Sequence, residues 1–206
     1  MAPVSLQPLM LGAARESYLY VPATYRVERP APLVLLLHGA GGHARQGLYQ
    51  LRSLADEAGV VLLAPASREY TWDLLVDRRY GPDVTLVDRA LEHVFSLYAV
   101  DTARIAVGGF SDGASYALSL GITTGDLFTH VLAFSPGFVA PAEQVGSPRI
   151  FVSHGTHDEV LPIDLCSRRI VPRLERAGYD VRYREFDGGH TISPEIALEA
   201  VDWFTG

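Results

Sequence analysis

The sequence has no lysine, no asparagine and only one cysteine, Cys166, among its 206 residues. A single cysteine excludes a disulfide within the chain and suits a reducing compartment, so we expect a cytoplasmic protein. Cys166 falls in a stretch with helical periodicity, where we expect a packed thiol. All seventeen basic residues are arginine, a usage typical of a GC-rich bacterial genome.

Long apolar runs and basic clusters are also missing. No run approaches the ~20 apolar residues that a membrane-spanning helix needs. The N-terminal residues 1–17 lack the basic start of a signal peptide, and none is expected. Seventeen basic and twenty-four acidic residues give a formal charge of −7, without a basic block that could follow a phosphate backbone. We therefore expect neither a transmembrane segment nor a nucleic-acid partner.

What the chain does contain is an alternation of strands and helices. Runs that are apolar at nearly every position predict strands buried on both faces at residues 33–37, 60–64, 105–107, 128–134 and 149–153. An alternating pattern predicts a further strand at residues 180–186. Helical periodicity is found at residues 46–58, 82–98, 163–177 and 194–204, and from Ser111 to about residue 122.

Two regions depart from this alternation. An N-terminal hairpin is expected from residues 16–21 and the region of Val27, interrupted by Pro22, and residues 67–80 are expected to form a long loop. We therefore predict one domain over residues 1–206, of the α/β class, with a doubly wound and mostly parallel sheet. Ligands of such sheets bind beyond the carboxyl ends of the strands.

Residues 109–113 read G-x-S-x-G, with Ser111 at the centre. The alternative is a glycine-rich turn with a solvent-facing serine. A buried strand before the motif and an Ala/Leu-rich helix after it instead favour a sharp, strained turn that exposes a nucleophilic hydroxyl above the sheet. The N-terminus of that helix would point its free N–H groups at the place where an oxyanion forms.

A serine nucleophile needs a base within hydrogen-bond reach and an acid that orients the base. His190 directly follows the last strand in FDGGHTISPE and is the expected base. The acid should lie between serine and histidine at the end of a strand, which favours Asp158 in SHGTHDEVLP. Glu159 and Asp187 are the alternatives.

Two backbone N–H groups are needed to bind the developing oxyanion. One is expected from Asp112, the residue after the nucleophile, and the other from the HGAGG loop, where Ala40 is favoured over Gly41. His154, His157 and Asp158 could also suggest a metal site, but no further ligands have suitable spacing. HGAGG lacks the Lys-Ser/Thr of a phosphate-binding loop. No metal and no cofactor are predicted.

With these residues in place, the chain resembles the α/β-hydrolase superfamily, and within it the phospholipase/carboxylesterase group that includes the acyl-protein thioesterases. The resemblance is carried by LLLHGAGG, GFSDGASYALSL, FVSHGTHDEVLP and DGGHTISPE. It implies Ser111 as nucleophile, His190 as base and Asp158 as acid, with Ala40 and Asp112 as oxyanion amides. The sequence departs from those thioesterases at Asp112, where they usually have glutamine, and in the Ala-Gly-Gly of its oxyanion loop.

Cap domains of this superfamily are usually inserted after the strand that follows the elbow helix. Here the segment after the strand that follows the helix of the Ser111 motif, residues 135–148, has only 14 residues, so no cap domain is expected and the site should be open. Trp72, Leu74, Leu75 and Phe138 are the candidate residues for an acyl-binding wall. The alternative is that the aromatic residues cover edges of the core.

The leading hypothesis is a serine carboxylic-ester hydrolase that acts through an acyl-enzyme, on short- to medium-chain acyl esters or thioesters of a small or acylated substrate. A non-catalytic binding module with this fold is a second hypothesis, because fold alone does not imply function. A small peptidase or acyltransferase is a third. The complete set of nucleophile, base, acid and oxyanion loops favours the first. The sequence leaves the oligomeric state open.

Overall fold

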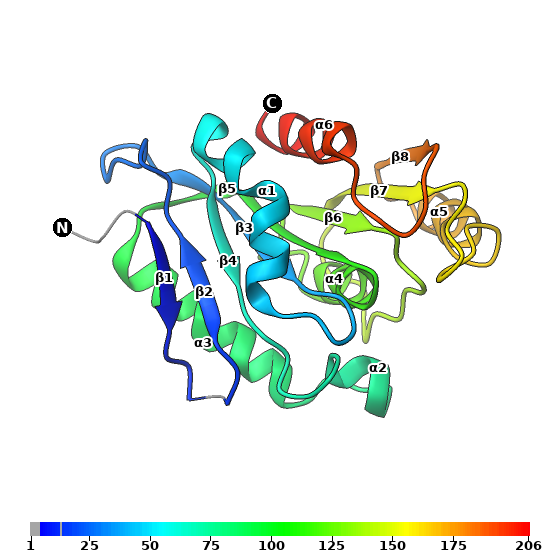
Figure 1. Cartoon of the computed structure of the whole chain (residues 1–206), viewed down its shortest axis with the longest axis horizontal. Helices are drawn as coiled ribbons and strands as arrows, with labels where there is room; N and C mark the ends of the chain where they lie inside the picture. The colour runs from blue at the N-terminus through cyan, green and yellow to red at the C-terminus, as the bar shows by residue number, and fades with distance from the viewer. Residues whose placement is uncertain (1–4, 13) are drawn as a thin grey trace.

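The computed structural model describes residues 5–12 and 14–206 (Figure 1). The expectation that residues 1–17 contain no signal peptide falls partly on residues 1–4 and 13, which lie outside the described residues. Within the described part, no helix is long and apolar enough to cross a membrane.

Eight strands form one sheet in the order β1-β2-β4-β3-β5-β6-β7-β8. The two N-terminal strands are antiparallel to their neighbours, and all pairings from β4 to β8 are parallel. The strands are β1 (Leu6–Leu9), β2 (Ser17–Tyr20), β3 (Ala31–Leu37), β4 (Val61–Ala64), β5 (Val100–Phe110), β6 (His130–Phe134), β7 (Arg149–Gly155) and β8 (Val181–Phe186). The predicted doubly wound, mostly parallel sheet is confirmed.

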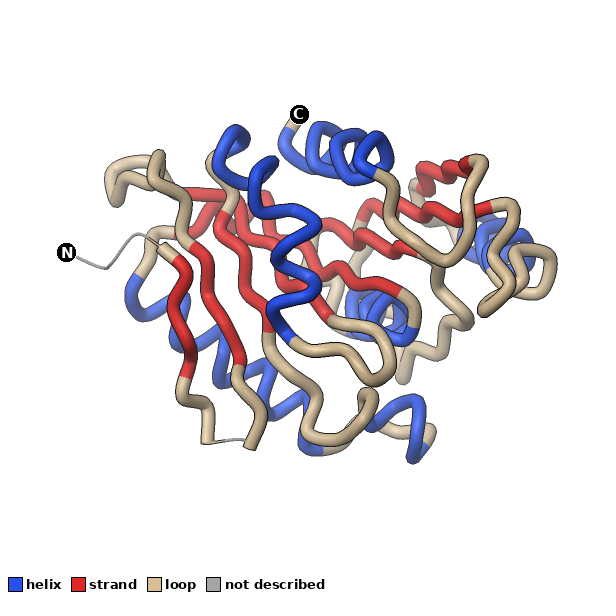
Figure 2. The backbone as a smooth tube through the Cα atoms, viewed as in Figure 1, coloured by secondary structure: helices blue, strands red, loops and turns tan. Residues whose placement is uncertain are grey.

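Helices cover both faces of this sheet, as Figure 2 shows. They are α1 (Ala44–Ala58), α2 (Asp73–Asp77), α3 (Pro82–Leu97), α4 (Asp112–Thr123), α5 (Ser167–Arg176) and α6 (Pro194–Thr205). Alternate side chains of β3 pack in two hydrophobic clusters. Leu35 belongs to the cluster that includes residues of α3, α4 and α5, and Leu36 belongs to the cluster that includes residues of α1 and α6. This double burial explains the uninterrupted apolar runs in the sequence.

The N-terminal hairpin differs from the prediction. Its strands are β1 and β2, and β2 also pairs with β4. Val27, expected in the second arm, is 63% exposed and lies in a short turn where Arg26 and Arg29 form an isolated bridge. Pro22 and Pro30 flank this turn, and proline lacks the N–H that a strand ladder needs.

Residues 67–80, expected to be a loop, contain the short helix α2. Two aspartates fasten this segment to the start of α3. The N–H of Asp83 donates to Asp73 Oδ2, the N–H of Asp73 donates to Asp83 Oδ2, and both distances are 2.9 Å. Residues 135–148 connect β6 to β7 without a helix or strand, so the described chain has no separate cap domain.

Three of the seven histidines are buried: His38, His130 and His154. Burial lowers the pKa of His38 and of His130 to about 4, and it also lowers the pKa of His154. A histidine in an unfolded chain has a pKa of about 6.5. Between these values the unfolded chain takes up protons that the folded protein does not. The contribution of these neutral rings to the free energy of unfolding is therefore complete above about pH 6.5 and is lost as the pH falls toward 4.

We therefore predict that the free energy of unfolding is lower at pH 5 than at pH 7, by roughly 1–2 kcal/mol for each of His38 and His130, and that His154 adds to the difference in the same direction. Urea unfolding at the two pH values measures the difference. His130→Gln should make the difference in free energy of unfolding between the two pH values smaller. His157→Gln, which removes a histidine with a 74% exposed side chain, should leave that difference unchanged. A free energy of unfolding that is equal at both pH values would contradict this account.

Candidate active site

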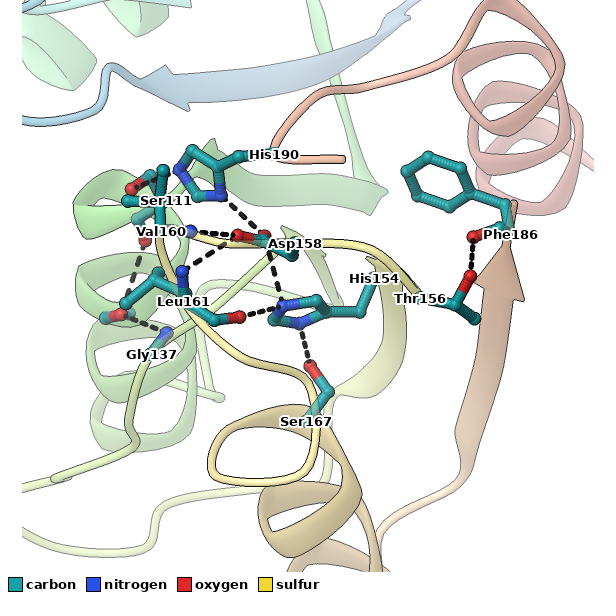
Figure 3. Close-up of polar contacts among 11 residues, drawn as sticks. Ser111, Gly137, His154, Thr156, Asp158, Val160, Leu161, Ser167, Phe186 and His190 are labelled. Carbon is teal, nitrogen blue, oxygen red and sulfur yellow. Dashed lines mark hydrogen bonds and ion pairs between the residues drawn. The ribbon is translucent and has the colours of Figure 1, made fainter. Parts of the chain in front are cut away.

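The predicted site residues gather at the carboxyl edge of the parallel strands. Ser111 directly follows β5, Asp158 follows β7, and His190 follows β8. Because neighbouring parallel strands end at the same edge of a sheet, three segments far apart in the sequence meet there. Figure 3 shows their side chains pointing toward one another.

Ser111 lies in a sharp turn between β5 and α4. Its backbone has φ 57° and ψ −119°, a strained combination for a residue with a side chain. Its N–H donates to the Phe134 carbonyl at 2.9 Å, which holds the turn against β6. A Cβ atom on Gly113 would collide with the Leu37 carbonyl, and one on Gly109 would collide with Gly113. The glycines of the motif are therefore required by the close approach of three backbone segments.

Serine, histidine and aspartate form one hydrogen-bonded line. The Ser111 hydroxyl donates to His190 Nε2 at 2.9 Å, and His190 Nδ1 donates to Asp158 Oδ2 at 2.6 Å. Ser111 is 9% exposed and the Asp158 side chain is fully buried. This arrangement can remove the proton of the serine hydroxyl and hold the resulting imidazolium beside a carboxylate.

The geometry favours Asp158 over the two alternative acids. Asp158 Oδ1 accepts the N–H groups of Val160 at 2.9 Å and Leu161 at 2.8 Å. Burial alone would raise the pKa of Asp158, but the Leu161 N–H and the His190 ring together hold it below its usual value. Glu159 is exposed, and Asp187, with a 93% exposed side chain, pairs with His157.

A second histidine, His154, contacts the same carboxylate from the buried side (Figure 3). Its Nε2 lies 2.8 Å from the Leu161 carbonyl and 3.2 Å from Asp158 Oδ2, and its Nδ1 lies 2.7 Å from the Ser167 hydroxyl. Two oxygen acceptors at Nε2 require the proton there, so Nδ1 accepts the Ser167 hydroxyl proton. Burial lowers the pKa of His154, which keeps the ring neutral. Sequence analysis considered His154 only as a metal ligand, and it missed this contact.

The HGAGG loop lies over the nucleophile. A Cβ atom on Gly39 would come within 3.3 Å of Ser111 Cβ. The N–H of Gly41 already donates to the Tyr70 carbonyl at 2.8 Å, and that of Gly42 donates to the Gly39 carbonyl at 3.0 Å. Both groups are therefore occupied, which favours Ala40 over Gly41 as the donor from this loop.

His38 holds this loop in place, a role that sequence analysis missed. Nδ1 of its ring lies 2.7 Å from the Gly39 carbonyl oxygen, and Nε2 accepts a hydrogen bond from the Ser67 N–H at 3.1 Å. With a pKa lowered to about 4 by burial, the ring is neutral and donates from Nδ1. The indole N–H of Trp72 donates to the His38 carbonyl at 2.8 Å, and Arg15 donates to the Gly42 carbonyl.

The candidate residues for an acyl-binding wall separate into two groups. Leu74, Leu75 and Phe138 line one cavity of about 660 Å³ between α2 and the segment after β6. Trp72 does not line it: its side chain is fully buried and packs between His38 and Tyr116. Its expected place on the wall is wrong, because the indole instead supports the loop that carries Ala40.

His154 and His157 are separated by their surroundings, since one is fully buried and the other is exposed. Within the part of the chain that the structure describes, no group of three or more histidine, cysteine and acidic side chains could hold a metal ion. Cys166 is buried at the start of α5, and burial raises the pKa of its thiol.

Comparisons with known proteins identify a matching family and a shared fold. A family model described as phospholipase/carboxylesterase matches residues 83–205, a range that contains Ser111, Asp158 and His190. A probable feruloyl esterase C of Aspergillus flavus is 28% identical over 159 residues. That alignment covers 73% of this chain but 57% of the relative, so the chain spans little more than half the length of this curated relative.

Solved structures share the fold over nearly the whole chain. Esterase PE8 has a TM-score of 0.71 at 25% identity, with 97% of this chain and 98% of that chain covered. A fluorophosphonate-binding serine hydrolase of Staphylococcus aureus has a TM-score of 0.78 at 12% identity, with both chains fully covered at 100%. The second likeness concerns the fold alone.

The contact of His154 with Asp158 leads to a prediction. His154→Leu removes the N–H that His154 directs at the carboxylate, so the charge of Asp158 then acts on protonated His190 alone. We expect ester hydrolysis to lose roughly tenfold in kcat with little change in KM, and the acidic limb of its pH–rate profile to move to higher pH. Steady-state kinetics from pH 5 to 9 measures both effects.

His154→Gln, which retains an N–H donor, should recover part of the loss, and His157→Gln serves as the exposed control. A His154→Leu profile that superimposes on the wild-type profile would show that His154 supports only the packing.

Proposed function

Because the chain belongs to the phospholipase/carboxylesterase family, whose model matches more than half of it, we propose that it is a serine carboxylic-ester hydrolase. The observation that carries the proposal is the continuous line from Ser111 through His190 to Asp158, which begins at a serine held in a strained turn. A serine placed for another purpose needs neither the strain nor the two partners.

In the proposed reaction, the Ser111 hydroxyl gives its proton to His190 Nε2 as its oxygen forms a bond to the acyl carbon. The carbonyl oxygen becomes an oxyanion, which the N–H groups of Ala40 and Asp112 bind. The tetrahedral intermediate then collapses: the bond to the leaving oxygen breaks, and His190 passes its proton to that oxygen. Asp158 stays ionised throughout and keeps the imidazolium oriented.

The second half of the reaction repeats these steps with water. His190 accepts a proton from water, the water oxygen bonds to the acyl carbon, and the acyl–Ser111 bond breaks as the serine oxygen regains a proton. The acid leaves and the enzyme is restored without any external cofactor. The scheme applies equally to oxygen esters and to thioesters.

The acyl chain is proposed to lie in the cavity lined by Leu74, Leu75 and Phe138. Its volume of about 660 Å³ falls within the range of small-molecule pockets, roughly 300–1,000 Å³. Apolar walls support an acyl substrate of short to medium length.

Kinetics with p-nitrophenyl esters of increasing chain length tests the proposal. We expect the wild-type protein to turn over these esters with an optimum in the short to medium range. Ser111→Ala and His190→Ala should each lower kcat by roughly 10⁴-fold or more, because neither residue is useful without the other. Ser96→Ala, at an exposed position of α3, is the matched serine control and should keep the wild-type kcat.

Folded wild-type protein that hydrolyses none of the esters would overturn the proposal and favour a non-catalytic binding module. Turnover that persists in Ser111→Ala would place the chemistry elsewhere.

A further inference from the structure

Phe110, the residue before the proposed nucleophile, lies against the proposed base. Its ring centroid is 4.6 Å from the centroid of the His190 imidazole, and the two ring planes are inclined by 41°. Aromatic pairs have centroids about 4.5–7 Å apart, so this contact is at the short end of the range. Phe110 neither donates nor accepts a proton in the proposed reaction, so any effect that it has on the chemistry passes through His190.

The imidazole of His190 is hydrogen-bonded at both ring nitrogens and has the Phe110 ring beside it. Nε2 lies 2.9 Å from Ser111 Oγ, and Nδ1 lies 2.6 Å from Asp158 Oδ2, in the line that Figure 3 shows. Both hydrogen bonds act in the plane of the imidazole, so they do not by themselves fix the tilt of that plane. The contact with Phe110 restricts this tilt.

The sheet directs Phe110 to the face from which the loop of the base arrives. Side chains alternate along a strand, and Phe110 packs, like Ala106, on the hydrophobic cluster that includes residues of α1 and α6. The loop of residues 187–193 leads from β8 into α6, and its Ile192 packs on the same cluster. Phe110 and His190 therefore meet on one face, at the carboxyl edge of the sheet.

Closely packed neighbours hold the Phe110 ring in this position. Phe110 is paired with Phe134 of β6, and its Cδ1 atom lies 3.6 Å from the place that a Cβ atom on Gly39 would occupy. Phe110, Gly39 and Ile192 line a crevice of about 20 Å³, which is room for about one water molecule. The ring therefore has little space in which to turn away from His190.

The contact changes in strength when His190 takes up a proton. The face of an aromatic ring carries partial negative charge and attracts a cation within about 6 Å of its centroid, a range that includes the 4.6 Å observed here. In the proposed reaction His190 is an imidazole before the attack of Ser111 and an imidazolium during it. An interaction that is stronger with the imidazolium stabilises the transition state more than the ground state, and it raises kcat.

We propose that Phe110 is a positioning residue, whose ring holds the His190 imidazole in line with Ser111 and stabilises the imidazolium that forms as the serine proton is transferred. This inference rests on the proposed esterase function and assigns a further residue to the same site. Phe110 acts on the base, so its effect falls on kcat and leaves KM unchanged.

Fluorinated phenylalanines test the effect of charge without removing the ring. 4-Fluoro-, 3,5-difluoro- and 3,4,5-trifluorophenylalanine in place of Phe110 keep nearly the same shape and progressively withdraw electrons from the ring face. We expect kcat for p-nitrophenyl butyrate to fall with each added fluorine, by roughly threefold to fivefold for three, with KM unchanged. The rate at which a fluorophosphonate modifies Ser111 should fall in parallel, because His190 takes up the serine proton in that reaction too.

Phe110→Leu removes the aromatic ring and keeps an apolar side chain, so it should lower kcat by roughly tenfold. The control places the same fluorinated residues at Phe95, which is 41% exposed on α3, and should change neither kcat nor the rate of modification. Thermal unfolding of each variant, with the wild-type midpoint for the fluorinated series, shows that the proteins compared are equally folded.

A fluorinated series at Phe110 with wild-type kcat would overturn this inference and leave the esterase function standing, whether or not Phe110→Leu loses activity. A series that changes KM alone would show that the ring contacts the substrate, and it would overturn the inference as well. Failure of the folded wild-type protein both to hydrolyse the ester and to react with the fluorophosphonate would overturn the esterase function, and this inference with it.

Discussion

The structure of the site depends on one buried negative charge, the carboxylate of Asp158. Moving a carboxylate out of water is costly unless hydrogen bonds replace the lost solvent. Here two backbone N–H groups reach one oxygen, and the rings of His190 and His154 reach the other. The carboxylate therefore stays ionised inside the protein, and it fixes the orientation of the histidine that faces Ser111.

The sheet supplies the rigidity that this charge requires. Parallel strands buried on both faces end at one edge, and the turns after β5, β7 and β8 bring their residues together there. The strained conformation of Ser111 is maintained because the backbone segments of Leu37, Gly109 and Gly113 pack closely around the turn. His38 and Trp72 brace the facing loop in a similar way, through groups that are buried and fully engaged.

Sequence reasoning reached the sheet and the meeting of Ser111, Asp158 and His190, because burial periodicity and strand-end motifs are local signals. It did not predict the roles of His38 and His154, because their contacts depend on how separate segments pack in the folded protein and follow no sequence motif. Trp72 was misplaced for a related reason: an aromatic residue in an irregular segment looks the same whether it lines a cavity or fills the core. The hairpin arm at Val27 failed because a β-branched residue alone does not specify pairing.

The measurement that tests the central claim most directly is site mapping after reaction with a fluorophosphonate. Such a reagent bonds covalently to an activated serine oxygen with loss of fluoride, and tandem mass spectrometry of the digested protein identifies the modified residue. The account predicts one adduct, on Ser111, at a rate that falls sharply in His190→Ala. A folded protein without an adduct, or an adduct on another serine such as Ser115, would contradict it.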